Sequence, residues 1–570
     1  MAESKDGKRS SVADDIAKSA SEATLALNPL VGVAGRDLLK ASASVMTAAA
    51  TQPHKMMRQW LDFASEFTNI ITNTSTTAPD PKDRRFADPA WQKNPLNKAL
   101  MQSYLTWQKA VAKTVEDMEL SEKDAAKARL VSSIFTDAMA PSNMLWTNPT
   151  ALKTLIDTGG QSAVSGLKNL FEDMTKNGGL PSSVDASKFK VGKNIATSPG
   201  HVVFRNEVLE VIHYTANTEK VYERPFVLVP PQINKYYSVD LSPEKSMIQF
   251  LLSEGIQPYC ISWRNPTAEQ RDWTLTTYIE ALDEGVEAAM AITGQKSVTM
   301  MGSCSGGITL SAYSAWLAAQ KQSKKIEALI LAVCVLNTQA ESDNDFAALV
   351  SPESIMLAKQ ASKARGVLDG QDMAKMFAWM RPNDLIWNYW VNNYLLGNKP
   401  PAFDVLYWNA DTTRLPAGLH GDFLDMISTN PFMNPKSLSL GGHAVDMTKV
   451  KHETMVIAGT TDHITPWKAV YETARIFGEN TEFILSNSGH LQSLLNPPGN
   501  PKSWYVKAPA KAKSADKWAE TAVKHEGSWW LDWAKFLQKH SGKQVKTPEA
   551  PGNKDYPTLG PAPGIYIFEE

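Results

Sequence analysis

The chain has little cysteine, and its 570 residues include no long run of uncharged apolar residues. Three cysteines, Cys260, Cys304 and Cys334, cannot build the disulfide framework of a secreted domain, so we expect a reducing compartment. Because no stretch of about eighteen uncharged apolar residues occurs, we predict no transmembrane segment. The first ten residues also lack the apolar core of a signal peptide. These absences predict a cytoplasmic protein.

The chain also has no excess of charge of either sign. Its 58 lysines and arginines almost balance its 60 aspartates and glutamates, which gives no reason to expect a nucleic-acid partner. No P-loop, dinucleotide-binding fingerprint or metal-ligand cluster occurs in the sequence, so we predict neither a cofactor nor a metal. Tryptophan, by contrast, is abundant at 17 residues, which is typical of a large apolar core or of a hydrophobic substrate.

The first part of the chain is expected to be helical. Residues 1–80 are rich in alanine, serine and threonine and only weakly periodic, so we expect a poorly ordered or amphipathic segment with weak helices before residue 50. Residues 81–195 have a strong helical pattern, which predicts an all-helical N-terminal domain. Within it, the spacing of Ser121 and Asp124 is typical of a helix start.

Residues 196–570 alternate between strands and helices, which predicts a mainly parallel sheet in an α/β fold. The predicted strands are 201–204, 208–214, 226–229, 257–263, 297–301, 326–336, 454–458 and 481–485. The alternation stops at about 337–441, an aromatic-rich segment that we interpret as a cap inserted over the carboxyl edge of the sheet. We expect most of its aromatics to form the core of the cap. The proline- and glycine-rich tail at 541–570 is expected to extend along the surface.

A predicted strand and a predicted helix meet at Gly302-Ser303-Cys304-Ser305-Gly306. This segment fits the nucleophile-elbow pattern G-x-S-x-G with cysteine in the serine position. In so sharp a turn, side chains at the two glycine positions would clash with neighbouring backbone, and the central residue projects from the sheet. A free cysteine is more often simply buried and inert. Because strand, glycines and helix occur here in register, we predict that Cys304 is a nucleophile.

An acid and a histidine follow the last two predicted strands. Asp462 comes after one strand and His490 after the other, which completes the chain order nucleophile, acid, histidine of α/β-hydrolases. A base must reach the nucleophile and must itself be oriented by a carboxylate, so we predict these three as the catalytic residues. His463 also follows a strand, but it abuts the acid and cannot easily face it, so we favour His490. The predicted fold class is an α/β-hydrolase fold with an inserted cap subdomain.

Stabilising a tetrahedral oxyanion requires two hydrogen-bond donors. The backbone N–H of Ser305, directly after the predicted nucleophile, is one candidate. The second donor is expected from the loop after the strand at 226–229, where Ile233 and Asn234 are the candidates.

With these residues identified, the chain resembles the poly(3-hydroxyalkanoate) synthases, bacterial polymerases of storage polyesters. The resemblance runs from about Arg84 to the C-terminus, and residues 1–80 match poorly. Its motifs are Gly302-Ser-Cys-Ser-Gly-Gly307, Val229-Pro-Pro-Gln-Ile-Asn-Lys-Tyr-Tyr237, Tyr407-Trp-Asn-Ala-Asp-Thr-Thr-Arg-Leu-Pro416, Gly459-Thr-Thr-Asp-His-Ile-Thr-Pro-Trp467, Asn487-Ser-Gly-His490 and Gly527-Ser-Trp-Trp530. Three features look like the pseudomonad, medium-chain type: Ser305 after the cysteine, the segment Thr412-Thr-Arg-Leu-Pro416 and the segment His420-Gly-Asp-Phe.

The resemblance implies an acyltransferase that uses (R)-3-hydroxyacyl-CoA and releases coenzyme A. Cys304 would attack the thioester, and the 3-hydroxyl of another unit or of the growing polyester chain would then attack the acylated cysteine. His490 would be the general base, and Asp462 would orient it or help to activate the hydroxyl. The resemblance also implies a homodimer at the surface of polyester granules in the cytoplasm, with the N-terminal helices in contact with the granule or with phasins.

Two other classes of function fit the same residues. A thioesterase, esterase or polyester hydrolase would use the same triad with water as the acceptor, although hydrolases of this fold usually carry serine. A granule-coating protein with an inactive hydrolase fold is the non-enzymatic alternative, against which the intact elbow, acid and histidine argue. The sequence leaves open the preferred acyl chain length and the surface that forms the dimer.

Overall fold

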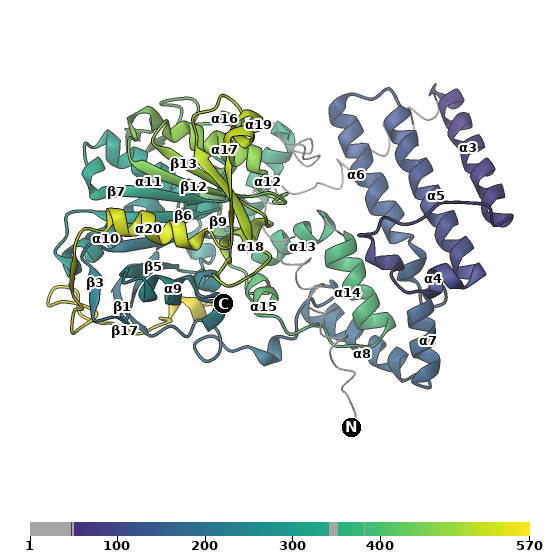
Figure 1. Cartoon of the computed structure of the whole chain (residues 1–570), viewed down its shortest axis with the longest axis horizontal. Coiled ribbons are helices and arrows are strands. Elements are labelled where there is room, and N and C mark those ends of the chain that lie inside the picture. The colour runs from purple at the N-terminus through teal and green to yellow at the C-terminus, as the bar shows by residue number, and fades with distance from the viewer. Residues whose placement is uncertain (1–46, 48–50, 341–350, 381) are drawn as a thin grey trace.

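The structure is a computed structural model that describes residues 47, 51–340, 351–380 and 382–570. Its N-terminal part is helical, as predicted, and lies beside a larger α/β part (Figure 1). The weak helices predicted before residue 50 lie outside the described residues, except for Thr47. The N-terminal helices are α3 (Pro53–Ile71), α4 (Ala90–Lys93), α5 (Pro95–Asp117), α6 (Glu122–Ala138), α7 (Pro149–Asp157) and α8 (Gln161–Lys176).

Capping residues determine where several of these helices begin. The Ser121 side chain accepts a hydrogen bond from the backbone N–H of Asp124 at 3.1 Å, so the predicted start of α6 is confirmed. Asn94 and Asn148 cap α5 and α7 in the same way, each followed by proline in the first turn. The small core of this part consists of Phe86, Trp91, Met101, Tyr104 and Ala140.

The α/β part is built on an 11-stranded sheet in the order β15-β14-β13-β12-β7-β6-β4-β5-β2-β1-β17. These strands are β1 (Gly200–Arg205), β2 (Leu209–Tyr214), β4 (Phe226–Val229), β5 (Pro258–Trp263), β6 (Val298–Ser303), β7 (Ile326–Ala332), β12 (Glu453–Gly459), β13 (Thr481–Ser486), β14 (Trp504–Pro509), β15 (Val523–Glu526) and β17 (Gly560–Pro561). Strands β4 to β7, β12 and β13 are parallel, and the outer strands are antiparallel. Every predicted strand overlaps an observed one, and the predicted parallel sheet is confirmed; β14, β15 and β17 were not predicted.

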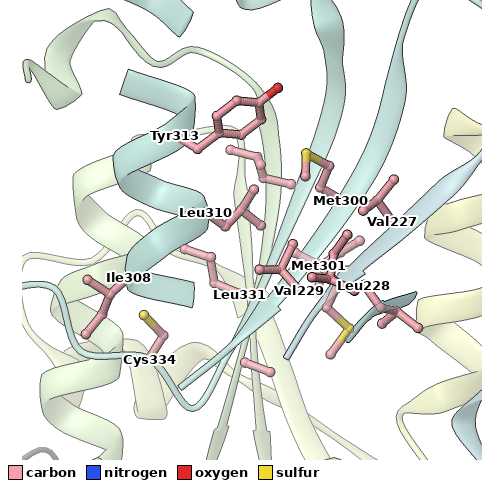
Figure 2. Close-up of a cluster of buried hydrophobic side chains, with 14 of the residues drawn as sticks. Val227, Leu228, Val229, Met300, Met301, Ile308, Leu310, Tyr313, Leu331 and Cys334 are labelled. Carbon is pink, nitrogen blue, oxygen red and sulfur yellow. The ribbon is translucent and has the colours of Figure 1, made fainter. Parts of the chain in front are cut away.

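Strand β6 lies at the centre of the sheet, and all of its residues are buried. The helices that accompany the sheet are α9 (Met247–Ser253), α10 (Leu275–Thr293), α11 (Ser305–Ala319), α17 (Trp467–Phe477), α18 (His490–Leu494), α19 (Ala515–Thr521) and α20 (Trp530–His540). Figure 2 shows Leu310 and Tyr313 of α11 beside Met300 and Met301 of β6, in one apolar cluster. The strand and helix that flank Cys304 are therefore both anchored in the core.

Between β7 and β12 the chain leaves the sheet and forms mostly helices. They are α12 (Pro352–Arg365), α13 (Gly370–Met380), α14 (Asn388–Trp390), α15 (Asp404–Ala410) and α16 (Ala417–Thr429), and α14 is flanked by the π-helical segments η10 (Asn383–Trp387) and η11 (Val391–Leu395). Two of its aromatics, Trp390 and Tyr394, pack on each other and also contact the N-terminal part. The indole of Trp390 donates to the Asn143 carbonyl at 3.0 Å, and the Tyr394 hydroxyl donates to Asp173 at 2.7 Å.

The C-terminal tail differs from the prediction because its last residues are partly internal. Strand β16 (Gln544–Lys546) pairs with β3 (Lys220–Tyr222), and β17 pairs with β1. Tyr566 and Ile567 are buried. Glu210, a fully buried carboxylate, helps to hold this end, because its oxygens accept the backbone N–H groups of Ile565 and Tyr566 at 3.0 and 3.1 Å.

Candidate active site

Cys304 lies between the end of β6 and the start of α11. Its backbone angles, φ 51° and ψ −123°, are rare for an L-residue and mark a strained turn. A Cβ atom on Gly302 would lie 2.6 Å from the carbonyl oxygen of Gly306, and a Cβ atom on Gly306 would lie 2.6 Å from the carbonyl oxygen of Pro230. Only glycine fits at both positions, and this permits the turn that holds Cys304.

Asp462 and His490 follow neighbouring parallel strands. Gly459 at the end of β12 pairs in register with Ser486 at the end of β13, so the residues that follow both strands emerge at the same edge of the sheet. Oδ2 of Asp462 lies 2.7 Å from Nδ1 of His490, and both side chains are completely buried. The structure brings these two predicted residues together, whereas His463 is only half-buried.

The Asp462 carboxylate is held by its own loop. Oδ1 accepts the backbone N–H groups of Ile464 and Thr465, both at 2.9 Å, and Oδ2 accepts the Thr465 hydroxyl at 2.6 Å. Burial alone would raise the pKa of Asp462, but His490 and Thr465 outweigh it and lower that pKa below its usual value. Thr465 was not among the predicted site residues. Its signal was the Asp-x-x-Thr spacing, which favours side-chain-to-backbone hydrogen bonds in a loop.

His490 interacts electrostatically with both of its predicted partners. Burial opposes protonation of the imidazole, but Asp462 and then Cys304 raise the pKa of His490 to about 10. Its Nδ1 is occupied by Asp462, so the buried Nε2 is left for the Cys304 thiol, which also raises the pKa of His490. An oriented imidazole with one free nitrogen beside a thiol is suited to move a proton to and from that thiol.

The candidate oxyanion residues lie around the elbow. Ser305 is the first residue of α11 and is fully buried, and its hydroxyl accepts the backbone N–H of Gln232 at 3.2 Å. Ile233 and Asn234 follow in the same loop and are also buried. The carbonyl of Ile233 accepts the backbone N–H of Thr413 at 3.1 Å. The loop therefore touches the elbow, although the identity of the second donor stays a prediction.

The segment 407–416, a motif to which the sequence analysis gave no role, binds the loop after β4. The indole of Trp408 donates to the carbonyl of Lys235 at 2.7 Å. The hydroxyl of Tyr237 donates to Asp411 at 2.8 Å. Two motifs that are far apart in the sequence are thus in direct contact, and the cap is fastened to the loop beside the elbow.

No metal centre is found among the described side chains. Across 51–340, 351–380 and 382–570, no group of three or more His, Cys, Asp or Glu residues is arranged to hold an ion. In those same ranges, none of the helices combines the length and the apolar character needed to cross a membrane.

Comparison with known proteins identifies the family. Residues 82–251 match the model described as the N-terminus of poly-beta-hydroxybutyrate polymerase (PhaC), and residues 225–497 match the α/β-hydrolase fold. Poly(3-hydroxyalkanoate) polymerase 1 of Ectopseudomonas oleovorans is 48% identical over 98% of this chain and 99% of its own. The chain belongs to the poly(3-hydroxyalkanoate) polymerase family.

Other poly(3-hydroxyalkanoate) polymerases align almost as completely. Polymerase 2 of Ectopseudomonas oleovorans is 44% identical over 95% of this chain and 96% of its own. The polymerase subunit PhaC of Cupriavidus necator is 34% identical over 94% of this chain and 91% of its own. The predicted family and the predicted α/β-hydrolase fold are both confirmed. The alignment with polymerase 1 spans 556 residues, so it also includes most of residues 1–80, where the sequence motifs had indicated only a poor match.

Proposed function

We propose that this chain polymerises (R)-3-hydroxyacyl-CoA into poly(3-hydroxyalkanoate) through an acyl group carried on Cys304. Membership of the polymerase family over nearly the whole chain supports the polymerisation. The contact of 2.7 Å between Asp462 and His490, beside a cysteine in a strained turn, supports the proposed roles of these three residues.

In the first step, Sγ of Cys304 attacks the thioester carbonyl of the substrate. A bond forms between Sγ and the acyl carbon, and the bond from that carbon to the sulfur of coenzyme A breaks. The thiol proton passes through Nε2 of His490 to the departing sulfur. Asp462 keeps Nδ1 occupied, so that Nε2 remains directed to the reaction. Because one thioester replaces another, the acyl group stays activated.

In the second step, the 3-hydroxyl of another unit or of the growing chain attacks the acyl carbon on Cys304. His490 takes the hydroxyl proton as the new C–O bond forms, and the C–S bond to Cys304 breaks. The proton then returns to the cysteine sulfur. The product is an ester that is one unit longer, and the enzyme is ready for another thioester. Asp462 orients His490 or helps to activate the hydroxyl.

The surroundings of the thiol favour polymer over hydrolysis. Cys304 is 3% exposed and His490 is fully buried, so bulk water has little access to the acylated cysteine. The backbone N–H of Ser305 is proposed as one oxyanion donor, and Ile233 or Asn234 supplies the other. The cap, which we place at 337–441, is proposed to help keep water from the acylated cysteine.

We further propose that the enzyme is a cytoplasmic homodimer that works at the surface of polyester granules. Residues 81–195 are proposed as a separate helical domain and 196–570 as the catalytic domain. We propose that helix α8 contributes to binding of the granule or of phasins. Four of its apolar residues, at helical spacing, are more than half exposed, which supports this role. They are Val164, Leu167, Phe171 and Met174.

A timed assay of the purified protein tests the proposal. With (R)-3-hydroxybutyryl-CoA and (R)-3-hydroxydecanoyl-CoA as substrates, thiol release and insoluble polyester would be recorded together. We expect thiol release with polymer, and none of either from Cys304→Ala. Release of free hydroxy acid without polymer would make the protein a thioesterase. A Cys304→Ala variant that keeps the activity would refute the acyl-cysteine. The substrate that is used faster identifies the preferred chain length.

A further inference from the structure

Lys235 is a buried cation in the loop between β4 and α9, the loop that reaches the elbow. Only 5% of the residue is exposed, and its Nζ donates to the backbone carbonyls of Ile567 and Glu569, both at 2.8 Å. These acceptors lie more than three hundred residues away in the sequence, at the end of the C-terminal tail. A lysine is rarely buried to this extent unless its charge and its N–H groups are compensated.

Charged groups from two distant parts of the chain, the cap and the C-terminal tail, surround this lysine. Burial lowers the pKa of Lys235 below its usual value, although Asp411 of the cap and Glu569 and Glu570 of the tail favour the charged form; Arg414 of the cap adds to the lowering. Asp411 is itself fixed by a hydrogen bond from Tyr237, in the same loop as Lys235. The excess of carboxylates and the two carbonyls compensate part of the cost of burying the ammonium group.

The tail is held in place independently of Lys235. The buried Glu210 accepts the backbone N–H groups of Ile565 and Tyr566, and Glu569 pairs with Arg264 at 3.1 Å. The tail is therefore a fixed support to which Lys235 attaches the loop.

The same loop contacts the helix that follows Cys304. Gln232, three residues before Lys235, donates its backbone N–H to the Ser305 hydroxyl at 3.2 Å and its side-chain amide to the Thr309 hydroxyl at 2.8 Å. The loop is attached to α11 at Gln232, to the cap at the carbonyls of Ile233 and Lys235, and to the tail through Nζ of Lys235. Loosening at Lys235 therefore removes one of the three attachments that position Ile233 and Asn234.

We propose that Lys235 is a positioning residue, which uses the C-terminal tail as a support to hold the oxyanion loop against the elbow at Cys304. This rests on the proposed function, in which that loop supplies a donor to the transition state. A donor that is displaced by about 1 Å loses much of its effect on the rate while substrate binding is little changed.

Four proteins test this proposal beside the wild type: Lys235→Met, Lys235→Arg, a chain that ends at Tyr566, and the shortened chain that also carries Lys235→Met. Ending at Tyr566 removes both carbonyl acceptors of Lys235 but keeps the N–H groups that Glu210 binds. Lys325→Met is the control, because Lys325 is a partly buried lysine, held by the carboxylates of Asp283 and Glu287 directly before β7, at the opposite end of the strands. The kcat and KM of thiol release are measured with the melting temperature of each protein.

We expect Lys235→Met to lower kcat by about 10²-fold with KM within about twofold of the wild type. The kcat of the shortened chain should fall by a similar factor. The kcat of the double variant should fall no further than that of either single variant, because both changes release the same contact. Lys235→Arg should recover part of kcat, and Lys325→Met should leave kcat unchanged.

Other outcomes overturn the proposal. Unchanged kcat in Lys235→Met, a rise of KM alone, or losses that multiply in the double variant would each show that Lys235 does not act through the tail. If Lys235→Met does not fold, the shortened chain carries the test, and full kcat in that protein refutes the proposal. A wild type that makes no polymer would instead refute the proposed function, so the two failures are distinguishable.

Discussion

Oδ2 of Asp462 lies 2.7 Å from Nδ1 of His490, although 28 residues separate them in the chain. The contact exists because β12 and β13 are adjacent parallel strands that end in register, and each residue follows one of them. An acceptor at Nδ1 selects the orientation in which Nε2 is left for the thiol. The proposed proton transfer through Nε2 therefore depends on the geometry of this pair.

Asp462→Asn tests whether that orientation matters. The asparagine amide fits the same space, but it would either present N–H groups to His490 or stop accepting from the Ile464 and Thr465 backbone. We expect kcat for thiol release to fall by about 10³–10⁴-fold while the melting temperature changes little. Thr465→Val removes one hydroxyl donor to the carboxylate and should lower kcat far less than Asp462→Asn does. Equal activity of Asp462→Asn and wild type would exclude an orienting role.

The stability of the protein should depend on pH through His490. The folded state raises the pKa of His490 from its ordinary 6.5 to about 10, so protonation of the imidazole favours folding. This contribution is complete below about pH 6.5 and disappears as the pH rises through about 10. Urea unfolding should therefore show a larger gap in free energy of unfolding between wild type and His490→Gln at pH 6 than at pH 9.5.

The same comparison in an Asp462→Asn background is the control for this pH dependence. Asp462 is the main group that raises the pKa of His490, so most of the variation with pH should vanish there. A gap that varies equally in both backgrounds would mean that another group is responsible.

Gly306→Ala should damage the elbow. The added Cβ would meet the backbone carbonyl oxygens of Val229 and Pro230, which cannot move aside as a flexible side chain would. We expect a loss of about 1–3 kcal/mol in the free energy of unfolding, and lower kcat because the oxyanion loop is pushed away. Gly421→Ala in α16 is the control, since its Cβ would find only the Lys359 side chain, 3.6 Å away. Similar melting temperatures for both variants would contradict this account.

The sequence predicted those features of the molecule that depend on local patterns. The elbow at Cys304 has a glycine on each side, within a strand and a helix of clear periodicity, and the structure shows why a side chain fits at neither glycine. The hairpin of β1 and β2 and the strands before Asp462 and His490 have equally local signals, which is why their positions were predicted closely.

The features that were missed depend on contacts between distant segments. Nothing in the sequence around Lys235 indicates that its ammonium group meets the carbonyl of Ile567, 332 residues away. The contact of Trp390 with Asn143 is of the same kind, because an aromatic-rich cap predicts burial but not the partner. The tail was predicted to be a surface segment because proline and glycine are typical of extended chain, whereas Glu210 fixes its end from outside that segment.

Cys304→Ser tests why the nucleophile is a cysteine. The serine hydroxyl fits the same turn, but at neutral pH it is a much weaker nucleophile than a thiol, and it would convert a thioester into a less activated ester. We expect thiol release to fall by roughly 10³-fold, with circular dichroism and melting temperature unchanged. Cys334→Ser is the control for general loss of a buried thiol, and it should still make polymer. A fully active Cys304→Ser enzyme would refute the proposed chemistry.

The exposed apolar face of α8 should hold the enzyme on its product. Leu167 and Phe171 are 67% and 69% exposed, while the opposite face of the helix packs against the cap through Gly166 and Asp173. Replacing both with glutamine removes apolar area without disturbing that packing, so we expect binding to amorphous polyester particles to weaken by about tenfold or more, as measured by sedimentation. Leu531→Gln, an exposed leucine on α20 in the α/β part, is the matched control and should sediment like the wild type. Loss of kcat on dissolved thioester in the α8 variant, with sedimentation unchanged, would show that the helix supports the cap and does not bind the granule.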